Sequence, residues 1–241
     1  MIWIRSAVFN VLFFTWTGIV VLFAVPLLAL PERVMIAYAR GWSWSLLFLL
    51  KVICGLDYRV VGREKVPEGG AIVACKHQSA WETIVYFAVF DAPVYILKRE
   101  LLMVPFFGWC LIKSGMIPID RKGGAVAMRK VITRATASLA LGRKIVIFPQ
   151  GTRVAPGVKA PYQPGAVRLY THLATPVVPA ALNSGRFWPR RSFLKHPGTI
   201  TLEFLDPIPP GLPRAKVARM IEQQVEEASD RLLAAETQPA G

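Results

Sequence analysis

The sequence predicts an α/β fold with an apolar helical membrane anchor at its N-terminus, and two patterns carry this prediction. Residues 6–30 contain no charged side chain and, as a helix, are long enough to cross a bilayer core of about 30 Å. From residue 57 onward, short apolar runs alternate with amphipathic segments and turn residues, as in folds whose strands alternate with helices. We therefore assign residues 1–56 to membrane-anchoring helices and residues 57–241 to an α/β domain.

The N-terminal apolar run is too long for the apolar segment of a signal peptide, which has about 7–15 residues. A second apolar segment, residues 41–56, is interrupted by Lys51 and contains two tryptophans, which favours an interfacial or returning helix. Residues 31–40 link the two segments and carry two arginines, which places this link on the cytoplasmic side by the positive-inside rule. A single span, a wedge from the cytoplasmic side and a buried core helix are the alternatives.

Seven apolar runs are predicted as strands, and the amphipathic segments between them as helices. The strands are residues 58–62, 71–75, 94–97, 116–119, 144–148, 176–180 and 199–204. Helices are expected after Ser79 and over residues 125–141, 166–172 and 215–233. Residues 236–241 are expected to fray.

The chain is both strongly basic and strongly apolar. It has a formal net charge of +14 and 54% hydrophobic residues, and its mean hydropathy is +0.41. Basic nucleic-acid-binding proteins are usually much less hydrophobic, so we expect an anionic membrane surface as partner and no nucleic acid. Cys54, Cys75 and Cys110 lie far apart in the sequence, which favours a reducing compartment and predicts neither a disulfide framework nor a metal site.

The segment KHQSAWE, residues 76–82, places His77 five residues before Glu82. Residues five apart on a helix are rotated by about 140°, so the two side chains can meet only if His77 precedes the helix. Ser79 and Glu82 match the capping-box pattern, which predicts a helix that starts at Ser79 and leaves His77 in the turn after a strand. Glu82 then either faces the histidine ring or only caps the helix.

Two more loops follow predicted strands. Asp120 and Arg121 come after residues 116–119, and FPQGTR brings the Gly151 amide and Arg153 to the end of the next strand. The carboxyl ends of strands are the usual ligand-binding edge of α/β sheets, and glycine turns with arginines bind phosphate. The alternative is that these arginines are solvated or paired with a carboxylate.

Four blocks in this order give residues 56–212 a resemblance to the glycerolipid acyltransferase family. The blocks are the spaced His77 and Glu82, GMIPIDR, FPQGTR and TPVVPAAL, and LKRELLMVPFFGW and TITLEFLDPIPP add to the likeness. The resemblance implies a mixed sheet flanked by helices at a membrane surface. It also implies transfer of a fatty acyl chain from a thioester of CoA or acyl carrier protein to the free hydroxyl of 1-acylglycerol-3-phosphate, which makes phosphatidic acid, with no further cofactor. Two positions depart from the usual motifs: Glu82 stands where aspartate is usual, and Gln150 replaces the glutamate of FPEGTR.

The chemistry of acyl transfer assigns roles to these residues. His77 is expected to act as general base, with Glu82 fixing its tautomer, so that the acyl chain is transferred directly. A covalent acyl-enzyme is the rival route, but Cys75 lies in a predicted strand and Ser79 in a capping position. Seven residues are expected to bind the substrates, because the resemblance implies it or because the side chain suits contact with a phosphate. They are Lys98, Arg99, Arg121, Gln150, Gly151, Thr152 and Arg153.

The resemblance also places the protein in the cell inner membrane, with the catalytic domain on the cytoplasmic face. The loop over residues 186–198 combines aromatic and basic side chains, which suits docking to anionic lipid or to an acyl carrier protein as well as simple solvation. Two other functions remain as alternatives: an acyltransferase for another lysolipid, such as lyso-ornithine lipid, and a non-enzymatic basic membrane-binding protein.

Overall fold

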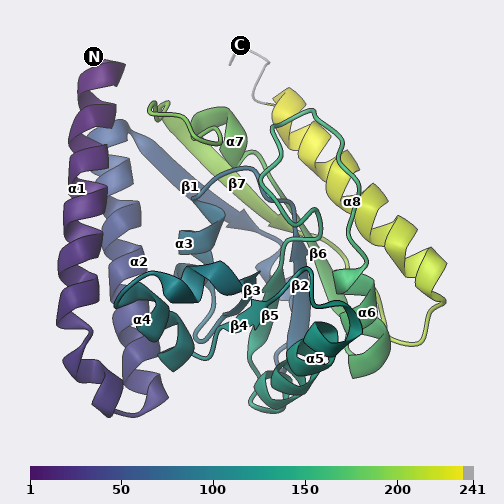
Figure 1. The fold of residues 1–241 in the computed structure, drawn as a ribbon. Helices are drawn as coiled ribbons and strands as arrows, with labels where there is room; N and C mark the ends of the chain where they lie inside the picture. The colour runs from purple at the N-terminus through teal and green to yellow at the C-terminus, as the bar shows by residue number, and fades with distance from the viewer. Residues whose placement is uncertain (236–241) are drawn as a thin grey trace.

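A computed structural model describes residues 1–235, and the expectation for residues 236–241 lies outside this range. Within the described chain, a seven-stranded mixed sheet is flanked by helices, as the sequence predicts (Figure 1). The strand order is β1-β7-β6-β2-β5-β3-β4; β7 runs antiparallel to β6 and parallel to β1, and the other neighbours are parallel. The strands are β1 Leu56–Val61, β2 Ala71–Cys75, β3 Val94–Lys98, β4 Ile117–Ile119, β5 Lys144–Ile147, β6 Val177–Leu182 and β7 Gly198–Phe204.

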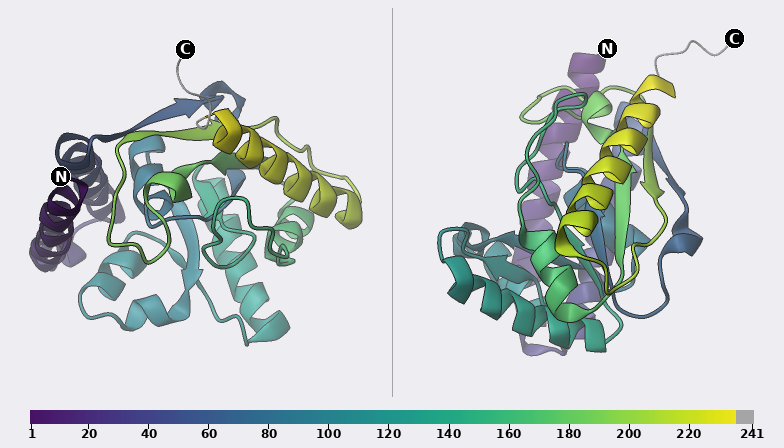
Figure 2. Two further views of the ribbon diagram at one scale, coloured as in Figure 1. Left: turned by 90° about the horizontal axis from the view of Figure 1, so that it is seen from above. Right: turned by 90° about the vertical axis from the view of Figure 1, so that its right-hand side faces the viewer.

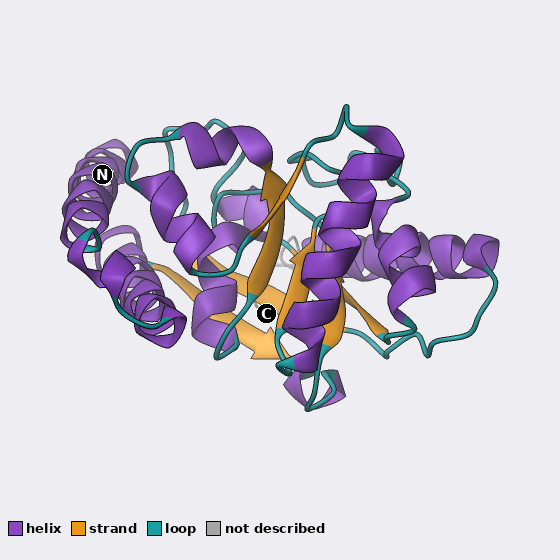
Figure 3. Cartoon of the chain, turned by 60° about the horizontal axis from the view of Figure 1, so that its bottom comes forward, coloured by secondary structure: helices purple, strands orange, loops and turns teal. Residues whose placement is uncertain are grey.

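Helices cover both faces of the sheet (Figure 3). The α-helices are α1 Ile2–Phe23, α2 Glu32–Cys54, α3 Glu82–Val89, α4 Phe107–Lys113, α5 Gly124–Ala140, α6 Gly165–Leu173, α7 Ser184–Phe187 and α8 Arg214–Ala235. Short 3₁₀ helices span η1 Pro26–Ala29, η2 Arg63–Lys65 and η3 Arg99–Met103. The predicted helices α5, α6 and α8 are confirmed, whereas α3 begins at Glu82 and not at Ser79.

Strand β2 shows how one sequence serves both faces of the sheet. All five of its residues are buried, but Ala71, Val73 and Cys75 join one apolar cluster while Ile72 and Ala74 join the other. This division follows from the two-residue period of a strand, which points successive side chains to opposite faces. The first cluster includes residues of α1, α2 and α3, and the second includes residues of α5, α6 and α8. A fully apolar strand is therefore expected in the middle of the sheet, between two helical layers.

The two N-terminal helices lie side by side at one end of the molecule, away from α8 (Figures 1 and 2). Helix α2 includes most of residues 31–40, so the prediction of a separate link there is wrong; the chain turns earlier, around η1. Gly55 ends α2 in the left-handed conformation, with φ of 64°, and its N–H bonds the carbonyls of Leu50 and Lys51. Phe9 of α1 and Leu50 of α2 belong to the same apolar cluster as the sheet, so both helices pack on the α/β domain.

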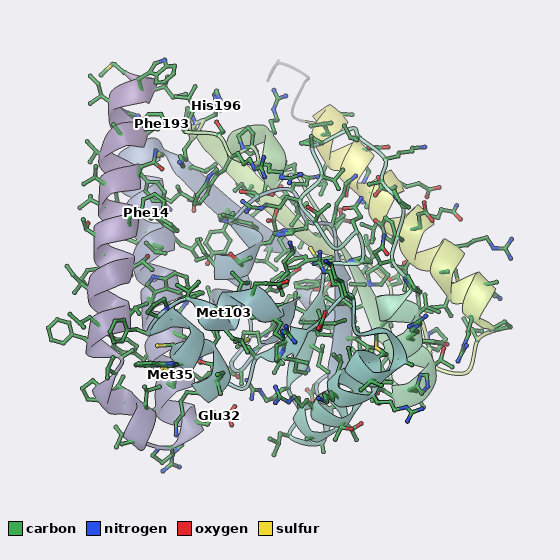
Figure 4. All side chains as sticks on the ribbon, in the orientation of Figure 1. Phe14, Glu32, Met35, Met103, Phe193 and His196 are labelled. Atoms are coloured by element: carbon green, nitrogen blue, oxygen red, sulfur yellow. The ribbon has the colours of Figure 1, made fainter. Side chains whose placement is uncertain are left out.

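Helix α1 is long and apolar enough to cross a membrane, and only 17% of its most apolar 18-residue segment is buried. Large apolar side chains such as Trp3 remain exposed along it, as does Phe14, which is labelled in Figure 4. The alternative of a buried core helix is therefore wrong for most of its surface, because such a helix buries its side chains. This exposed face is suited to contact with lipid.

The sheet topology collects the predicted site residues at one edge. Strands β2, β5, β3 and β4 are parallel neighbours in this order, so their carboxyl ends lie together. His77 follows β2, FPQGTR follows β5, and Asp120 and Arg121 follow β4. Segments far apart in the sequence thus meet where α/β sheets commonly bind ligands.

Candidate active site

His77 and Glu82 meet, as the sequence predicts. The Nδ1 atom of His77 lies 3.1 Å from Oε2 of Glu82, whose side chain is fully buried. The imidazole stacks on the ring of Phe148, with 4.1 Å between centroids and 16° between planes. Because a carboxylate faces Nδ1, the hydrogen of the neutral ring belongs on Nδ1, and Nε2 keeps its lone pair. This is the tautomer that a general base needs.

Glu82 accepts several hydrogen bonds besides that of His77. Its Oε2 accepts from the N–H of Ser79 at 2.9 Å, and its Oε1 lies 3.1 Å from the same nitrogen and 3.3 Å from the nitrogen of Gln78. The hydroxyl of Ser184 also donates to Oε1. Both oxygens of this buried carboxylate are thus satisfied by hydrogen-bond donors of the protein. Glu82 therefore makes the predicted capping bond and faces the ring, so the two interpretations of this residue hold together.

The turn before α3 explains the late start of that helix. The Ser79 hydroxyl accepts a hydrogen bond from the N–H of Trp81 at 3.2 Å, and the Glu82 carboxylate takes the N–H groups of Gln78 and Ser79. These side-chain bonds satisfy the backbone without helical geometry. The first hydrogen bond of α3 runs from Val85 N–H to the Trp81 carbonyl at 3.0 Å.

His77 lines a cavity of about 560 Å³. The part of the wall contributed by α1, α2 and α4 is mostly apolar and includes Val20, Met35, Trp42 and Leu111. Another part carries Lys98, Arg121, Gly151, Thr152 and Arg153, which the sequence analysis selected, together with Arg190 and Arg191. Within residues 1–235, no aspartate or glutamate lines this cavity.

The loops that follow β4 and β5 meet at Gly151. This glycine has φ of 70°, a left-handed conformation that other residues rarely adopt, and a Cβ added to it would lie 3.7 Å from the guanidinium carbon of Arg121. In the described chain, neither Arg121 nor Arg153 forms an ion pair with a carboxylate. Two guanidinium groups without a carboxylate, beside a glycine turn, form a site suited to a phosphate group.

Two of the selected residues do not line this cavity. Arg99 forms an ion pair with Asp120 at 3.1 Å across the ends of β3 and β4. Gln150 is buried, and its amide nitrogen lies 3.4 Å from Glu226 of α8, which places the side chain away from the cavity. Among the described residues, no group of three or more His, Cys, Asp and Glu side chains is placed to hold a metal ion.

Sequence reasoning missed Ser184, Arg190 and Arg191 as members of this site. Ser184 begins α7 directly after β6, which runs parallel to β2, so the rule that selected the other loops applies to it as well. Arg190 and Arg191 lie in the basic and aromatic loop after α7. The loop is held near FPQGTR by a hydrogen bond of 3.0 Å from Arg190 Nη1 to the carbonyl of Arg153.

Neither Cys75 nor Ser79 is placed as a nucleophile. Both side chains are buried, and burial raises the pKa of the Cys75 thiol well above its ordinary value. The Ser79 hydroxyl is engaged by the N–H of Trp81. The protein group that lies next to both the cavity and a buried carboxylate is the His77 ring.

Comparison with known proteins agrees with this geometry. A family model described as Acyltransferase matches residues 57–183. The chain is 35% identical over 201 residues to a 1-acyl-sn-glycerol-3-phosphate acyltransferase of Pseudomonas aeruginosa, covering 82% of this chain and 77% of the relative. It is 27% identical to an enzyme of the same name from Cocos nucifera, covering 57% of this chain but only 46% of the relative.

A solved structure shares the fold. The crystal structure of the 1-acyl-sn-glycerophosphate acyltransferase of Thermotoga maritima superposes with a TM-score of 0.79, over 97% of this chain and 98% of the other, at 18% sequence identity. The likeness thus extends beyond residues 57–183 to the N-terminal helices and to α8. On the strength of the matched family model and the Pseudomonas relative, this chain belongs to the acyltransferase family.

Proposed function

We propose that this protein transfers a fatty acyl chain from a thioester to the free hydroxyl of 1-acylglycerol-3-phosphate, with His77 as general base. The observation that carries the proposal is the pairing of His77 with the buried Glu82 beside a cavity that is apolar on one side and rich in arginine on the other. Such a cavity suits a substrate with an acyl chain and a phosphate. The names of the relatives in Pseudomonas and Cocos support the same acceptor.

The proposed reaction is a direct transfer in two steps. His77 Nε2 removes the proton of the acceptor hydroxyl while its oxygen attacks the thioester carbonyl, forming the new C–O bond. The C–S bond then breaks, and the departing sulfur takes the proton from the imidazolium, so that a free thiol leaves and His77 is neutral again. Glu82 stabilises the imidazolium between the steps and keeps the hydrogen on Nδ1. The burial of Cys75 and Ser79 argues against a covalent acyl-enzyme.

The acceptor phosphate is assigned to Arg121 and Arg153, with the Gly151 amide and the Thr152 hydroxyl beside them. Besides Arg121 and Arg153, the cavity is lined by three more cationic side chains, those of Lys98, Arg190 and Arg191. The thioester donors, acyl-CoA and acyl carrier protein, both carry phosphate groups, and these three residues are their candidate partners. Lysophosphatidic acid in the membrane and a thioester from the cytoplasm would meet at this site, which favours a cytoplasmic-facing site on the inner membrane.

Acyl transfer by the purified full-length protein tests the proposal. We expect phosphatidic acid from 1-acylglycerol-3-phosphate with acyl-CoA, acyl carrier protein thioesters or both, and little product from lysolipids that lack the phosphate. His77→Ala should lower kcat by about 10²–10⁴-fold, the usual contribution of a general base. His172→Ala is the matched control, because His172 is exposed on α6 and, among residues 1–235, its ring bonds only the carbonyl of Arg168 on its own helix. Equal rates in these two variants would refute the assignment of His77.

A further inference from the structure

A buried ion pair lies directly beside the base. Lys76 immediately precedes His77, its side chain is fully buried, and its Nζ lies 2.6 Å from Oε2 of Glu226. Glu226 is on α8, 12% exposed, and outside the residues that the family model matches. A buried ammonium group without a counter-charge is costly, so this single carboxylate keeps Lys76, and with it the start of the His77 turn, in place.

The same carboxylate holds the phosphate-binding loop. The hydroxyl of Tyr162 donates to Glu226 Oε1 at 2.9 Å, and the amide nitrogen of Gln150 lies 3.4 Å from the same oxygen. Burial and the charge of Glu226 raise the pKa of Tyr162 well above its ordinary value, so this phenol stays a donor. Glu226 thus receives hydrogen bonds from Lys76, Tyr162 and Gln150, which come from three separate segments.

The two loops that Glu226 joins are the two halves of the active site. Gln150 immediately precedes Gly151 in FPQGTR, as Lys76 immediately precedes His77 in KHQSAWE. The loops also touch directly, because the N–H of Val154 donates to the carbonyl of His77 at 2.8 Å. A substitution of Glu226 is therefore expected to displace Lys76, next to His77, and Gln150, next to Gly151.

The uncharged side chain of Gln150 is consistent with the charges of the residues around Glu226. Lys76 and Glu226 balance each other, and a glutamate at position 150 would bring a second carboxylate to within about 3.4 Å of Glu226 with no further cation. Glutamate would also lose the amide N–H that now faces Glu226. Two buried carboxylates this close oppose each other's ionisation. A neutral side chain at position 150 is thus compatible with a buried carboxylate at position 226.

We infer that Glu226 is a positioning residue for acyl transfer: it supplies from α8 the negative charge that FPEGTR loops carry within the loop, and it sets the relative placement of His77 and the phosphate-binding turn. This inference rests on the proposed function. It assigns to the C-terminal helix a role in the reaction that none of the four sequence motifs contains.

Exchanging the charge between the two positions tests the inference. Glu226→Gln leaves Lys76 without a counter-charge, and Gln150→Glu adds a carboxylate beside Glu226. We expect each to lower kcat by roughly 10- to 100-fold, the usual range for loss of a supporting hydrogen bond or a small misplacement. The double variant Gln150→Glu/Glu226→Gln restores one carboxylate for the one buried ammonium group in this region and should recover most of the rate. Glu227→Gln is the matched control, since the side chain of this exposed neighbour on α8 bonds only Gln223 within the described chain, and the variant should keep the wild-type rate.

A second measurement separates this inference from the proposed function. The chain has three histidines, so the Cε1–H NMR signal of His77 can be assigned with single variants and followed without any substrate. We expect this signal to move in Glu226→Gln, to return in the double variant and to stay in Glu227→Gln. If the wild type transfers no acyl chain, the proposed function fails while the NMR comparison still decides the coupling.

Additive losses in the double variant, or a Glu226→Gln protein that matches Glu227→Gln in both rate and NMR signal, would overturn the inference. Should Glu226→Gln not fold, Gln150→Glu and the double variant decide alone. A Gln150→Glu protein with the wild-type rate would then be the contrary result.

Discussion

Replacing Glu82 by glutamine tests the acid partner of the base, and the structure shows why this change is severe. Its two oxygens accept from the N–H groups of Gln78 and Ser79, from the Ser184 hydroxyl and from the His77 ring. Glutamine has one acceptor oxygen and one NH₂ donor. In either orientation of the amide, a donor must face a backbone N–H. A glutamine at this position therefore disturbs the hydrogen bonds of the turn, those of the ring or both.

The magnitude follows from the two orientations. With NH₂ toward Gln78, a buried N–H loses its partner, which costs about 1–3 kcal/mol of the free energy of unfolding. With NH₂ toward His77, the amide donates to Nδ1, so the ring hydrogen moves to Nε2 and the base is lost. A wrong tautomer of this kind lowers kcat by about 10⁴-fold in serine proteases. We therefore expect Glu82→Gln to lose about 10²–10⁴-fold in kcat and to be less stable.

The assay compares initial rates at saturating 1-acylglycerol-3-phosphate and acyl donor, together with urea unfolding of the same preparations. Asp91→Asn is the control, because the Asp91 side chain is 93% exposed and makes one surface ion pair with Arg40. This control should keep both the wild-type rate and the wild-type stability. A Glu82→Gln enzyme as fast as Asp91→Asn would show that His77 works without its carboxylate, and would refute the tautomer argument.

Two further predictions concern the acceptor and the membrane. Arg121→Ala and Arg153→Ala should each raise the KM for 1-acylglycerol-3-phosphate or lower kcat. The loss of activity should be smaller on a lysolipid without phosphate. Equal losses of activity on both acceptors would assign these arginines to the fold or to binding of the donor. Phe14→Glu should weaken flotation with anionic vesicles, because burying such a side chain contributes about 1.5–3 kcal/mol and Phe14 is 70% exposed on α1. Val158→Glu, which changes an exposed valine in the loop after FPQGTR, should float as the wild type does, and equal flotation of both variants would place the membrane contact elsewhere.

Deleting residues 1–30 would be a poor test of the membrane contact. Phe9 is fully buried against Trp188, and the Ser6 hydroxyl accepts a hydrogen bond of 3.0 Å from the N–H of Lys195. Removing α1 would therefore expose part of the domain core, and loss of membrane binding could not be separated from unfolding. A single substitution on the exposed face leaves this packing intact.

The strands were predictable from local patterns, whereas the pattern around His77 and Glu82 left open whether the carboxylate faces the ring or only caps the helix. A short apolar run such as AIVAC, flanked by turn residues, favours a strand buried on both faces, and the sheet then brings the ends of its parallel strands to one edge. The start of α3 was not predictable from the capping box, because the same side chains can satisfy the N–H groups of a non-helical turn. Glu226 was out of reach for a different reason: it contacts Lys76 from 150 residues away, and nothing in the sequence around it marks a partner.

The connection from Glu82 to helix α1 follows a short path through α7 and the loop after it. Ser184, at the start of α7, donates to Glu82, and Trp188, just after α7, packs edge-on against Phe9 of α1. Further along the same loop, Phe193, labelled in Figure 4, stacks on Trp3 of α1 with 5.7 Å between ring centroids. Helix α1 meanwhile contributes Val20 to the cavity wall and exposes Phe14. Helix α1 therefore borders the cavity directly and packs on the segment whose Ser184 bonds Glu82, so a substitution that shifts α1 is expected to change the surroundings of both.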